Sequence, residues 1–179
     1  IFGSRGLGDV YKRQESNLII TTGGVSVGDA DYIRDALLKI GSINFWKISI
    51  KPGRPLAFGT IGSSYFFGLP GNPVSTSVTF DLFVRPAIYK ILSLEKRKDI
   101  TIKATLVGAL RKKRGRVEYK RGILFKKEDK YYVKASGLQG SNILSSLAIA
   151  NCYIKLGMDI ENIKESEIVT TIPFEVSHE

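Results

Sequence analysis

The residues best suited to chemistry lie in two glycine-rich loops, each directly after a short apolar segment. The loops span residues 23–31 (GGVSVGDAD) and 69–75 (LPGNPVS). Glycine leaves backbone N–H groups accessible, and a helix that begins after such a loop adds its positive end, so both loops suit a phosphate or another anion. Glycine turns also precede helices for purely geometric reasons, so both interpretations stay open on spacing alone. The first loop is neither a Walker A loop nor a dinucleotide-binding GxGxxG motif.

The polar side chains of these loops also have two interpretations. Asp29 and Asp31 flank the start of a predicted helix, where a carboxylate either caps the helix or holds Mg²⁺ against a phosphate. In the second loop, Asn72 suits a helix N-cap and Pro73 suits the first helical position, while Asn72 and Ser75 could also contact a polar ring or a phosphate. The presence of two such loops favours a ligand site.

Three cations follow the first loop. Lys47 and Lys51 are four residues apart in an apolar segment predicted as one strand, so we expect both on the same face, with Arg54 in the next turn. If the neighbouring loops bind an anion, these cations complete an oxyanion pocket. An exposed cationic strand end is the alternative.

The elements that position these residues follow an α/β pattern in the first half of the chain. The predicted strands there are 18–22, 43–50, 56–60 and 65–69, and the predicted helices are 32–40, which Gly41 would end as a C-cap, and 73–92. Beyond the polar segment 93–99 the pattern changes to short strands at 100–110, 116–125, 131–135, 148–156 and 168–173. We therefore expect half of an α/β domain over 15–95 and a small β-barrel-like domain over 96–179. Residues 1–14 show neither the helical nor the strand periodicity of apolar residues, and they are predicted to be a non-native or truncated end.

Composition restricts the classes of function. The 179 residues include one cysteine and one histidine, Cys152 and His178, which disfavour disulfides, cysteine-based metal cages and a Ser-His-Asp triad. The absence of a long apolar segment predicts no membrane span, and we expect a cytoplasmic protein. The net charge is +10, with +3 over residues 1–95 and +7 over residues 96–179. The densest basic segment, 111–116, with Lys126 and Lys127, is interpreted as solvated surface, an anion funnel or, least of all, a nucleic-acid patch.

Three segments together resemble one known family. TTGGVSVGDADY, FWKISIKPGRPLAFG and FFGLPGNPVS, in this order, are similar to the signatures of the MoeA/gephyrin E-domain family, the molybdopterin molybdenumtransferases. RVEYKRG at 116–122 and GLQGSNILSS at 137–146 resemble the C-terminal β-domain of that family. The resemblance implies a partial three-layer molybdopterin-binding domain followed by a barrel-like β-domain.

The resemblance also implies an activity and a site. The activity is insertion of molybdate into adenylylated molybdopterin with release of AMP, assisted by Mg²⁺. Asp31 would handle Mg²⁺ or the phosphoanhydride, and Asp31, Lys47 and Lys51 would be catalytic. The residues implied to bind substrate are Gly23, Gly24, Ser26, Gly28, Pro52, Arg54, Pro70, Gly71, Asn72, Pro73, Ser75, Arg121 and Ser141. The molybdate pocket that the resemblance implies consists of Lys51, Pro52, Arg121 and Ser141. This set is chemically suitable, because a tetrahedral dianion requires converging cationic and hydroxyl donors.

Two other classes of function remain: adenylyltransferase-like pterin binding, and a non-catalytic scaffold or interaction module. The resemblance implies a homodimer in the parent protein, with no nucleic-acid or membrane partner. Because the family's N-terminal parts precede the first loop, we expect the 179 residues alone to lack turnover.

Overall fold

The structure is a computed structural model that describes residues 16–23, 37–94 and 100–174. The chain divides into two compact units. The α/β unit comprises residues 1–48 and 53–94, and the β-unit comprises residues 49–52 and 95–179. The boundary expected at 95–96 and the segment 1–14 both lie outside the described residues. Among the described residues, no helix is long and apolar enough to cross a membrane.

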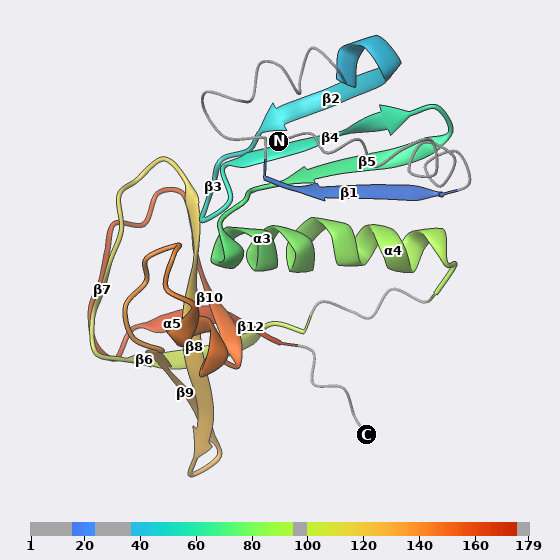
Figure 1. The fold of residues 1–179 in the computed structure, drawn as a ribbon. Helices are drawn as coiled ribbons and strands as arrows, with labels where there is room; N and C mark the ends of the chain where they lie inside the picture. The colour runs from blue at the N-terminus through green and yellow to red at the C-terminus, as the bar shows by residue number, and fades with distance from the viewer. Residues whose placement is uncertain (1–15, 24–36, 95–99, 175–179) are drawn as a thin grey trace. The chain divides into compact units, whose positions relative to one another are not determined.

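A four-stranded sheet with strand order β1-β5-β4-β2 forms the centre of the α/β unit (Figure 1). The bounds are β1 Leu18–Thr22, β2 Gly41–Lys47, β4 Pro55–Ile61 and β5 Ser64–Leu69. β1 and β5 are parallel, whereas β4 pairs antiparallel with both β5 and β2. The parallel pair brings the ends of β1 and β5, and therefore the starts of both glycine-rich loops, to one edge of the sheet.

A continuous helical run packs on one face of this sheet (Figure 1). It consists of α3 Pro73–Thr79, the π-helical segment η1 Phe80–Val84 and α4 Arg85–Ile91. Its core contacts include Leu56, Leu69 and Val84, which are 0–1% exposed. A single α-helix over 73–92 was expected, and the π-helical turn is a correction. Pro86 has no N–H for the carbonyl four residues earlier, and a wider turn accommodates its ring.

The opposite face of the sheet has a second core of Ala57, Phe66 and Leu37. Residues 37–40 are helical, and Gly41 is the first residue of β2 rather than the expected C-cap. A Cβ on Gly41 would lie 1.9 Å from the Thr60 carbonyl oxygen, so the close approach of β4 is what requires glycine here. Gly59 meets Ser42 in the same way, at 1.9 Å.

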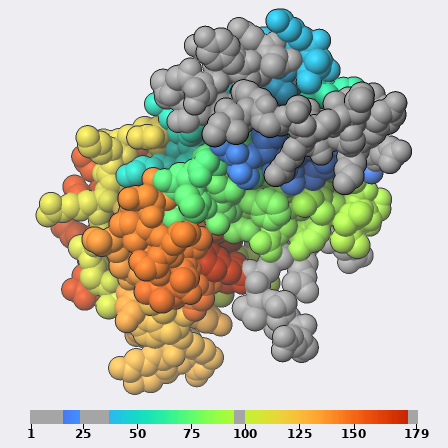
Figure 2. All heavy atoms as spheres, in the orientation of Figure 1, coloured from blue at the N-terminus to red at the C-terminus, as the bar shows by residue number. Residues whose placement is uncertain are grey.

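The β-unit is a small closed barrel with one added strand. Its sheet has strand order β10-β12-β6-β9-β8-β3, and a further β10–β8 pairing closes the ring. The bounds are β3 Ile50–Lys51, β6 Ile102–Val107, β8 Val117–Lys127, β9 Lys130–Ala135, β10 Cys152–Leu156 and β12 Ile168–Pro173. The barrel core includes Leu106, Val133, Ile154 and Leu156. Figure 2 shows the β8–β9 hairpin tip projecting from the rest of this unit.

Three short elements of the β-unit were not expected from the sequence. α5 Leu144–Ala148 is a helix where only strands and turns were predicted, and β7 Leu110–Arg111 pairs with β11 Asn162–Ile163. The basic segment 111–116 is also not uniformly solvated. Lys112 is 7% exposed, and its Nζ donates to the carbonyls of Ile160 at 2.7 Å and Met158 at 3.3 Å. Lys112 therefore holds the turn before β11.

The predicted strand 43–50 is in fact two strands in different units. β2 ends at Lys47, and β3 pairs parallel with β8 of the barrel, with Ile50 opposite Val117 and Lys51 opposite Glu118. The residues on either side of β3 are joined by a hydrogen bond in which the Ile48 N–H donates to the Arg54 carbonyl at 3.0 Å. Segment Ser49–Pro52 thus leaves the α/β unit, joins the barrel sheet and returns.

Cys152 provides a pH-dependent test of the barrel core. It is fully buried, and burial raises the pKa of its thiol from 9.0 to about 12, with a backbone hydrogen bond at Leu124 opposing the shift. Because the unfolded thiol ionises first, the free energy of unfolding should fall as pH rises from 9 toward 12. The expected loss is about 1.4 kcal/mol at pH 10 relative to pH 8. Urea unfolding of the wild type and of Cys152→Ala at several pH values checks this. If the free energy of unfolding fell equally with pH in both proteins, the prediction would be contradicted.

Candidate functional site

The two glycine-rich loops start side by side. Thr22 and Leu69 are partners at the ends of β1 and β5, and the Gly23 N–H donates to the Leu69 carbonyl at 3.0 Å. Gly23 has φ +83°, and a Cβ on Gly71 would lie 3.2 Å from its Cα. A side chain at residue 71 would crowd the backbone of residue 23, whereas Gly23 is required for its left-handed conformation. The structure therefore brings together the backbone at Gly23 with that at Gly71.

Asn72 differs from its expected use. It occupies the N-cap position of α3 with Pro73 following, as predicted, but its side chain makes no capping hydrogen bond. Among the described residues, its buried Oδ1 has no hydrogen-bond partner. The Thr76 hydroxyl instead donates to the carbonyls of Pro70 and Asn72, at 2.5 and 2.9 Å, and holds the loop shape. Within that part of the chain, Asn72 Oδ1 is thus a buried acceptor that lacks a donor.

Ser75 is less accessible than predicted. It is 6% exposed, and its backbone carbonyl accepts a hydrogen bond from the Thr79 hydroxyl at 2.8 Å. Ser75 is therefore a buried residue of the first turn of α3.

The expected row of cations on one strand face was wrong. Lys47 is the exposed last residue of β2 in the α/β unit, and Arg54 is exposed in the turn before β4 of the same unit. Lys51 belongs to the β-unit, and Pro52 beside it is buried. The strand prediction failed because the pairing of β3 with β8 overrides the local apolar pattern.

Arg121 lies on β8 and is 1% exposed. Its Nε and both Nη nitrogens donate hydrogen bonds at 2.9–3.1 Å, to Ser146 Oγ and to the carbonyls of Leu138, Gln139 and Gly140. Burial lowers the pKa of the guanidinium, while Tyr153 and the Glu118 carboxylate oppose that shift. Arg121 thus ties down the loop that leads to the half-buried Ser141.

A buried charge cluster in the same unit was missed by sequence reasoning. Glu118, 4% exposed, lies 3.0 Å from Lys120 Nζ and 3.3 Å from Lys51 Nζ. The available signal was a pair of opposite charges two residues apart in a strand, which places both on one face.

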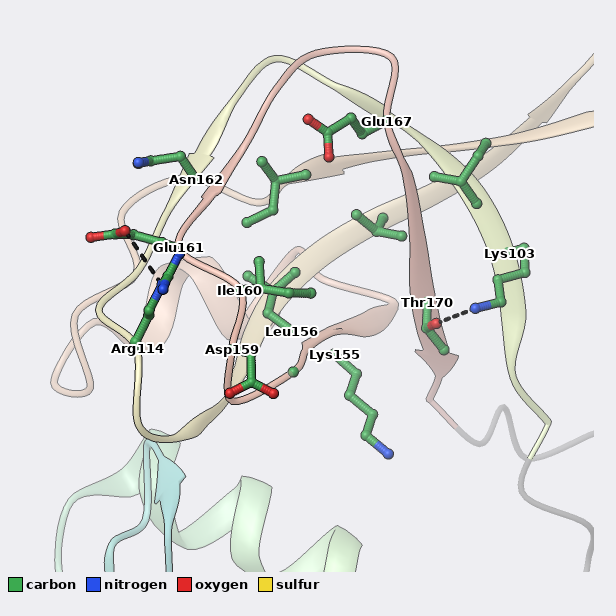
Figure 3. Close-up of a pocket in the computed structure, with 14 residues that line it drawn as sticks. Lys103, Arg114, Lys155, Leu156, Asp159, Ile160, Glu161, Asn162, Glu167 and Thr170 are labelled. Atoms are coloured by element: carbon green, nitrogen blue, oxygen red, sulfur yellow. Dashed lines mark hydrogen bonds and ion pairs between the residues drawn. The ribbon is translucent and has the colours of Figure 1, made fainter.

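The β-unit also has an open pocket of about 730 Å³ (Figure 3). Apolar Leu156 and Ile160 lie among charged side chains, with Lys103 bonded to Thr170 at 2.8 Å and Arg114 paired with Glu161 at 3.6 Å. None of the predicted site residues lines it.

Four predicted site residues, Gly24, Ser26, Gly28 and Asp31, lie outside the described residues. Within residues 16–23, 37–94 and 100–174, no group of three or more His, Cys, Asp or Glu side chains is arranged to hold a metal.

Comparison with known proteins identifies both units. Residues 7–90 match the model described as "Probable molybdopterin binding domain", and residues 103–174 match "MoeA C-terminal region (domain IV)". The chain belongs to the MoeA family over these two domains. A molybdopterin molybdenumtransferase from Haemophilus influenzae is 42% identical over 167 residues, covering 92% of this chain and 41% of that protein. Gephyrin from Dictyostelium discoideum is 33% identical, covering 89% of this chain and 26% of that protein.

Solved structures give the same assignment of the MoeA fold. A molybdenum cofactor biosynthesis protein from Pyrococcus furiosus superposes with a TM-score of 0.71 and 25% identity, covering 93% of this chain and 53% of that one. A MoeA protein from Pyrococcus horikoshii gives a TM-score of 0.76 over 97% of this chain and 41% of its own length, at an identity of 23% that shows the fold alone. The chain spans less than half the length of the curated relatives described above. These matches confirm the expected fold class, an α/β domain followed by a small β-barrel.

Proposed function

We propose that this chain supplies part of the site that inserts molybdate into adenylylated molybdopterin and releases AMP. The junction of the two loops supports this proposal most directly. There Gly23 meets Gly71, and the buried Asn72 Oδ1 lacks a partner among the residues that the structure describes. Backbone donors at glycine loops suit the phosphates, and the amide oxygen suits an N–H donor of the pterin. Relatives named molybdopterin molybdenumtransferase support the same reaction.

The β-unit supplies the oxyanion end in this proposal. Lys51, which precedes Pro52, offers an ammonium group on a side chain that is 52% exposed. Ser141 offers a hydroxyl group. Arg121 acts through the loop that carries Ser141, since its nitrogens already donate to that loop and to Ser146. The match to the MoeA C-terminal region favours the transferase over adenylyltransferase-like pterin binding or a scaffold module, because those alternatives give the second domain no chemical task.

Mg²⁺, a homodimer and a cytoplasmic location also remain proposals. Asp31 is the predicted carboxylate for Mg²⁺. The described part of the α/β unit offers one other carboxylate, Asp81, which is already paired with Arg85.

Asp31→Asn should therefore weaken Mg²⁺-dependent binding of adenylylated molybdopterin about tenfold or more while leaving Mg²⁺-independent binding unchanged. Titration with and without Mg²⁺ checks this, and equal losses in both conditions would contradict a metal role.

Asn72→Ala tests the pterin site. Removing an unpartnered acceptor should leave the free energy of unfolding within about 0.5 kcal/mol of wild type. The same change should weaken adenylylated molybdopterin binding by roughly tenfold, the effect of one lost hydrogen bond of about 1.4 kcal/mol. Calorimetric titration of the 179-residue chain measures the affinity.

Asn151→Ala is the matched control. The Asn151 side chain makes two hydrogen bonds with the Leu124 backbone in the β-unit, at 2.7 and 2.8 Å. We expect it to lower stability by about 1–2 kcal/mol without changing pterin affinity. If wild type fails to bind the pterin, or Asn72→Ala binds as well as wild type, the proposed site is wrong.

A further inference from the structure

The backbone of Arg121 lies where the β8–β9 ladder ends. The ladder stops at the pair of Gly122 with Ala135, so the Arg121 N–H needs an acceptor that β9 no longer provides. The Gln139 side chain takes this place. The Arg121 N–H donates to Gln139 Oε1 at 2.8 Å, and Gln139 Nε2 donates to the Arg121 carbonyl at 3.1 Å. A carboxamide has the same donor and acceptor as a peptide group, so Gln139 substitutes for a strand residue.

The Arg121 side chain holds the loop of Gln139 in return. Its Nη1 donates to the Gln139 carbonyl at 3.1 Å, and its Nη2 donates to the carbonyls of Leu138 and Gly140 at 3.1 and 2.9 Å. Gln139 Nε2 also donates to the Gly137 carbonyl at 2.9 Å. All four carbonyls of residues 137–140 therefore accept hydrogen bonds from these two side chains.

Ser141 lies between two anchored carbonyls of the same loop. The Gly140 carbonyl before it accepts hydrogen bonds from Arg121 Nη2 and, at 3.2 Å, from the Ile143 N–H. The Ile143 carbonyl after it accepts a hydrogen bond at 2.9 Å from Ser146 Oγ, whose residue is 2% exposed. The contacts of its neighbours therefore fix the backbone position of Ser141.

We propose that Gln139 is a positioning residue for oxyanion binding and that it acts through Ser141. The inference rests on the proposed function, in which Ser141 offers its hydroxyl group at the oxyanion end. Gln139 does not itself bind the oxyanion, because both polar atoms of its side chain already bond with the backbone. Loss of its amide would leave the Arg121 N–H without its acceptor and would release one side of the loop.

The test is a double-mutant cycle between Gln139 and Ser141. The wild-type 179-residue chain, Gln139→Leu, Ser141→Ala and the double variant are titrated with sodium molybdate at constant ionic strength. Gln139→Leu should weaken molybdate binding about tenfold, as Ser141→Ala does, because each removes one well-placed hydrogen bond to the anion. The double variant should bind no more weakly than Ser141→Ala, since Gln139 then has no hydroxyl group to position.

Asn151 provides a matched control on the same strand. Its side chain bridges the N–H and the carbonyl of Leu124 at 2.7 and 2.8 Å, as Gln139 does at Arg121, but this bridge does not involve residues 137–143. Asn151→Leu should lower the urea midpoint of the β-unit about as much as Gln139→Leu and leave molybdate affinity unchanged. Hydrogen exchange of the amides of residues 137–143 should accelerate in Gln139→Leu and not in Asn151→Leu.

The outcomes separate the inference from the proposed function. Unchanged molybdate affinity in Gln139→Leu, losses that multiply in the double variant, or an equal loss in Asn151→Leu overturns the inference, while a weakened Ser141→Ala still supports the oxyanion end. Unchanged affinity in Ser141→Ala, or no molybdate binding by the wild type, counts against that end of the proposed function and overturns the inference with it. If Gln139→Leu does not fold, Gln139→Asn gives the same comparison, because its amide is one methylene too short for the bridge.

Discussion

Arg121→Ala is expected to lower the free energy of unfolding of the β-unit by about 3–5 kcal/mol. The guanidinium is 1% exposed and serves Ser146 and three carbonyls between Leu138 and Gly140. Its removal leaves these buried acceptors without donors and creates a cavity. Arg121→Lys should restore less than half of the loss, because one ammonium group cannot reach the same acceptors as a planar guanidinium.

The two units allow the effect to be located. The chain has one tryptophan, Trp46, which packs in the α/β unit against the cluster of Ala57 and Phe66. Its fluorescence should report an unchanged urea transition in Arg121→Ala, while hydrogen exchange of the amides around residues 138–146 should accelerate. Arg111→Ala, the same change at an exposed site, should cost less than about 0.5 kcal/mol. A loss below about 1 kcal/mol in Arg121→Ala would show that the loop is held by other contacts.

Gly59→Ala is expected to destabilise the α/β unit by about 3 kcal/mol. The added Cβ would lie 1.9 Å from the Ser42 carbonyl oxygen, and backbone atoms on β2 cannot rotate away as a side chain would. The pairing of β2 with β4 would have to open or shift. Trp46 lies on β2, so its fluorescence should follow this transition directly.

Gly62→Ala separates the steric effect from the conformational one. Gly62 has φ +57° in the turn between β4 and β5, with open space around its missing Cβ. Its substitution should cost only about 1–2 kcal/mol, the penalty of a left-handed conformation. Equal losses in the two variants would mean that glycine at residue 59 is required for its backbone conformation and not for the close approach of β2.

Local patterns predicted most of the elements correctly. The β-branched run at 18–22 corresponds to β1, the strands predicted at 56–60 and 65–69 correspond to the β4–β5 hairpin, and Pro73 begins α3 as expected. The strand at 168–173 matches β12 residue for residue. These features succeed because alternation, turn chemistry and helix-start preferences act over a few neighbouring residues. The loop motifs also identified the family.

The contacts that individual residues make could not be predicted from these local patterns. Asn72 is a good N-cap by type, yet its side chain makes no capping hydrogen bond and its oxygen has no partner in the described part of the chain. The Thr76 hydroxyl holds that turn instead. Gly41 looked like a helix C-cap but permits the close approach of β4. In both cases the deciding contact comes from the three-dimensional packing and not from the residue's own preference.

Local residue patterns were enough to predict the order of most elements, the two glycine-rich loops and the family to which they belong. The positions of the charged site residues depend instead on the tertiary structure. It divided the predicted 43–50 strand, so that Lys47 stays in the α/β unit and Lys51 enters the barrel sheet. It also placed Glu118, Lys120 and Arg121 in buried positions. Such burial depends on pairing between strands far apart in the chain, such as β3 with β8, and no local pattern of residues encodes that pairing.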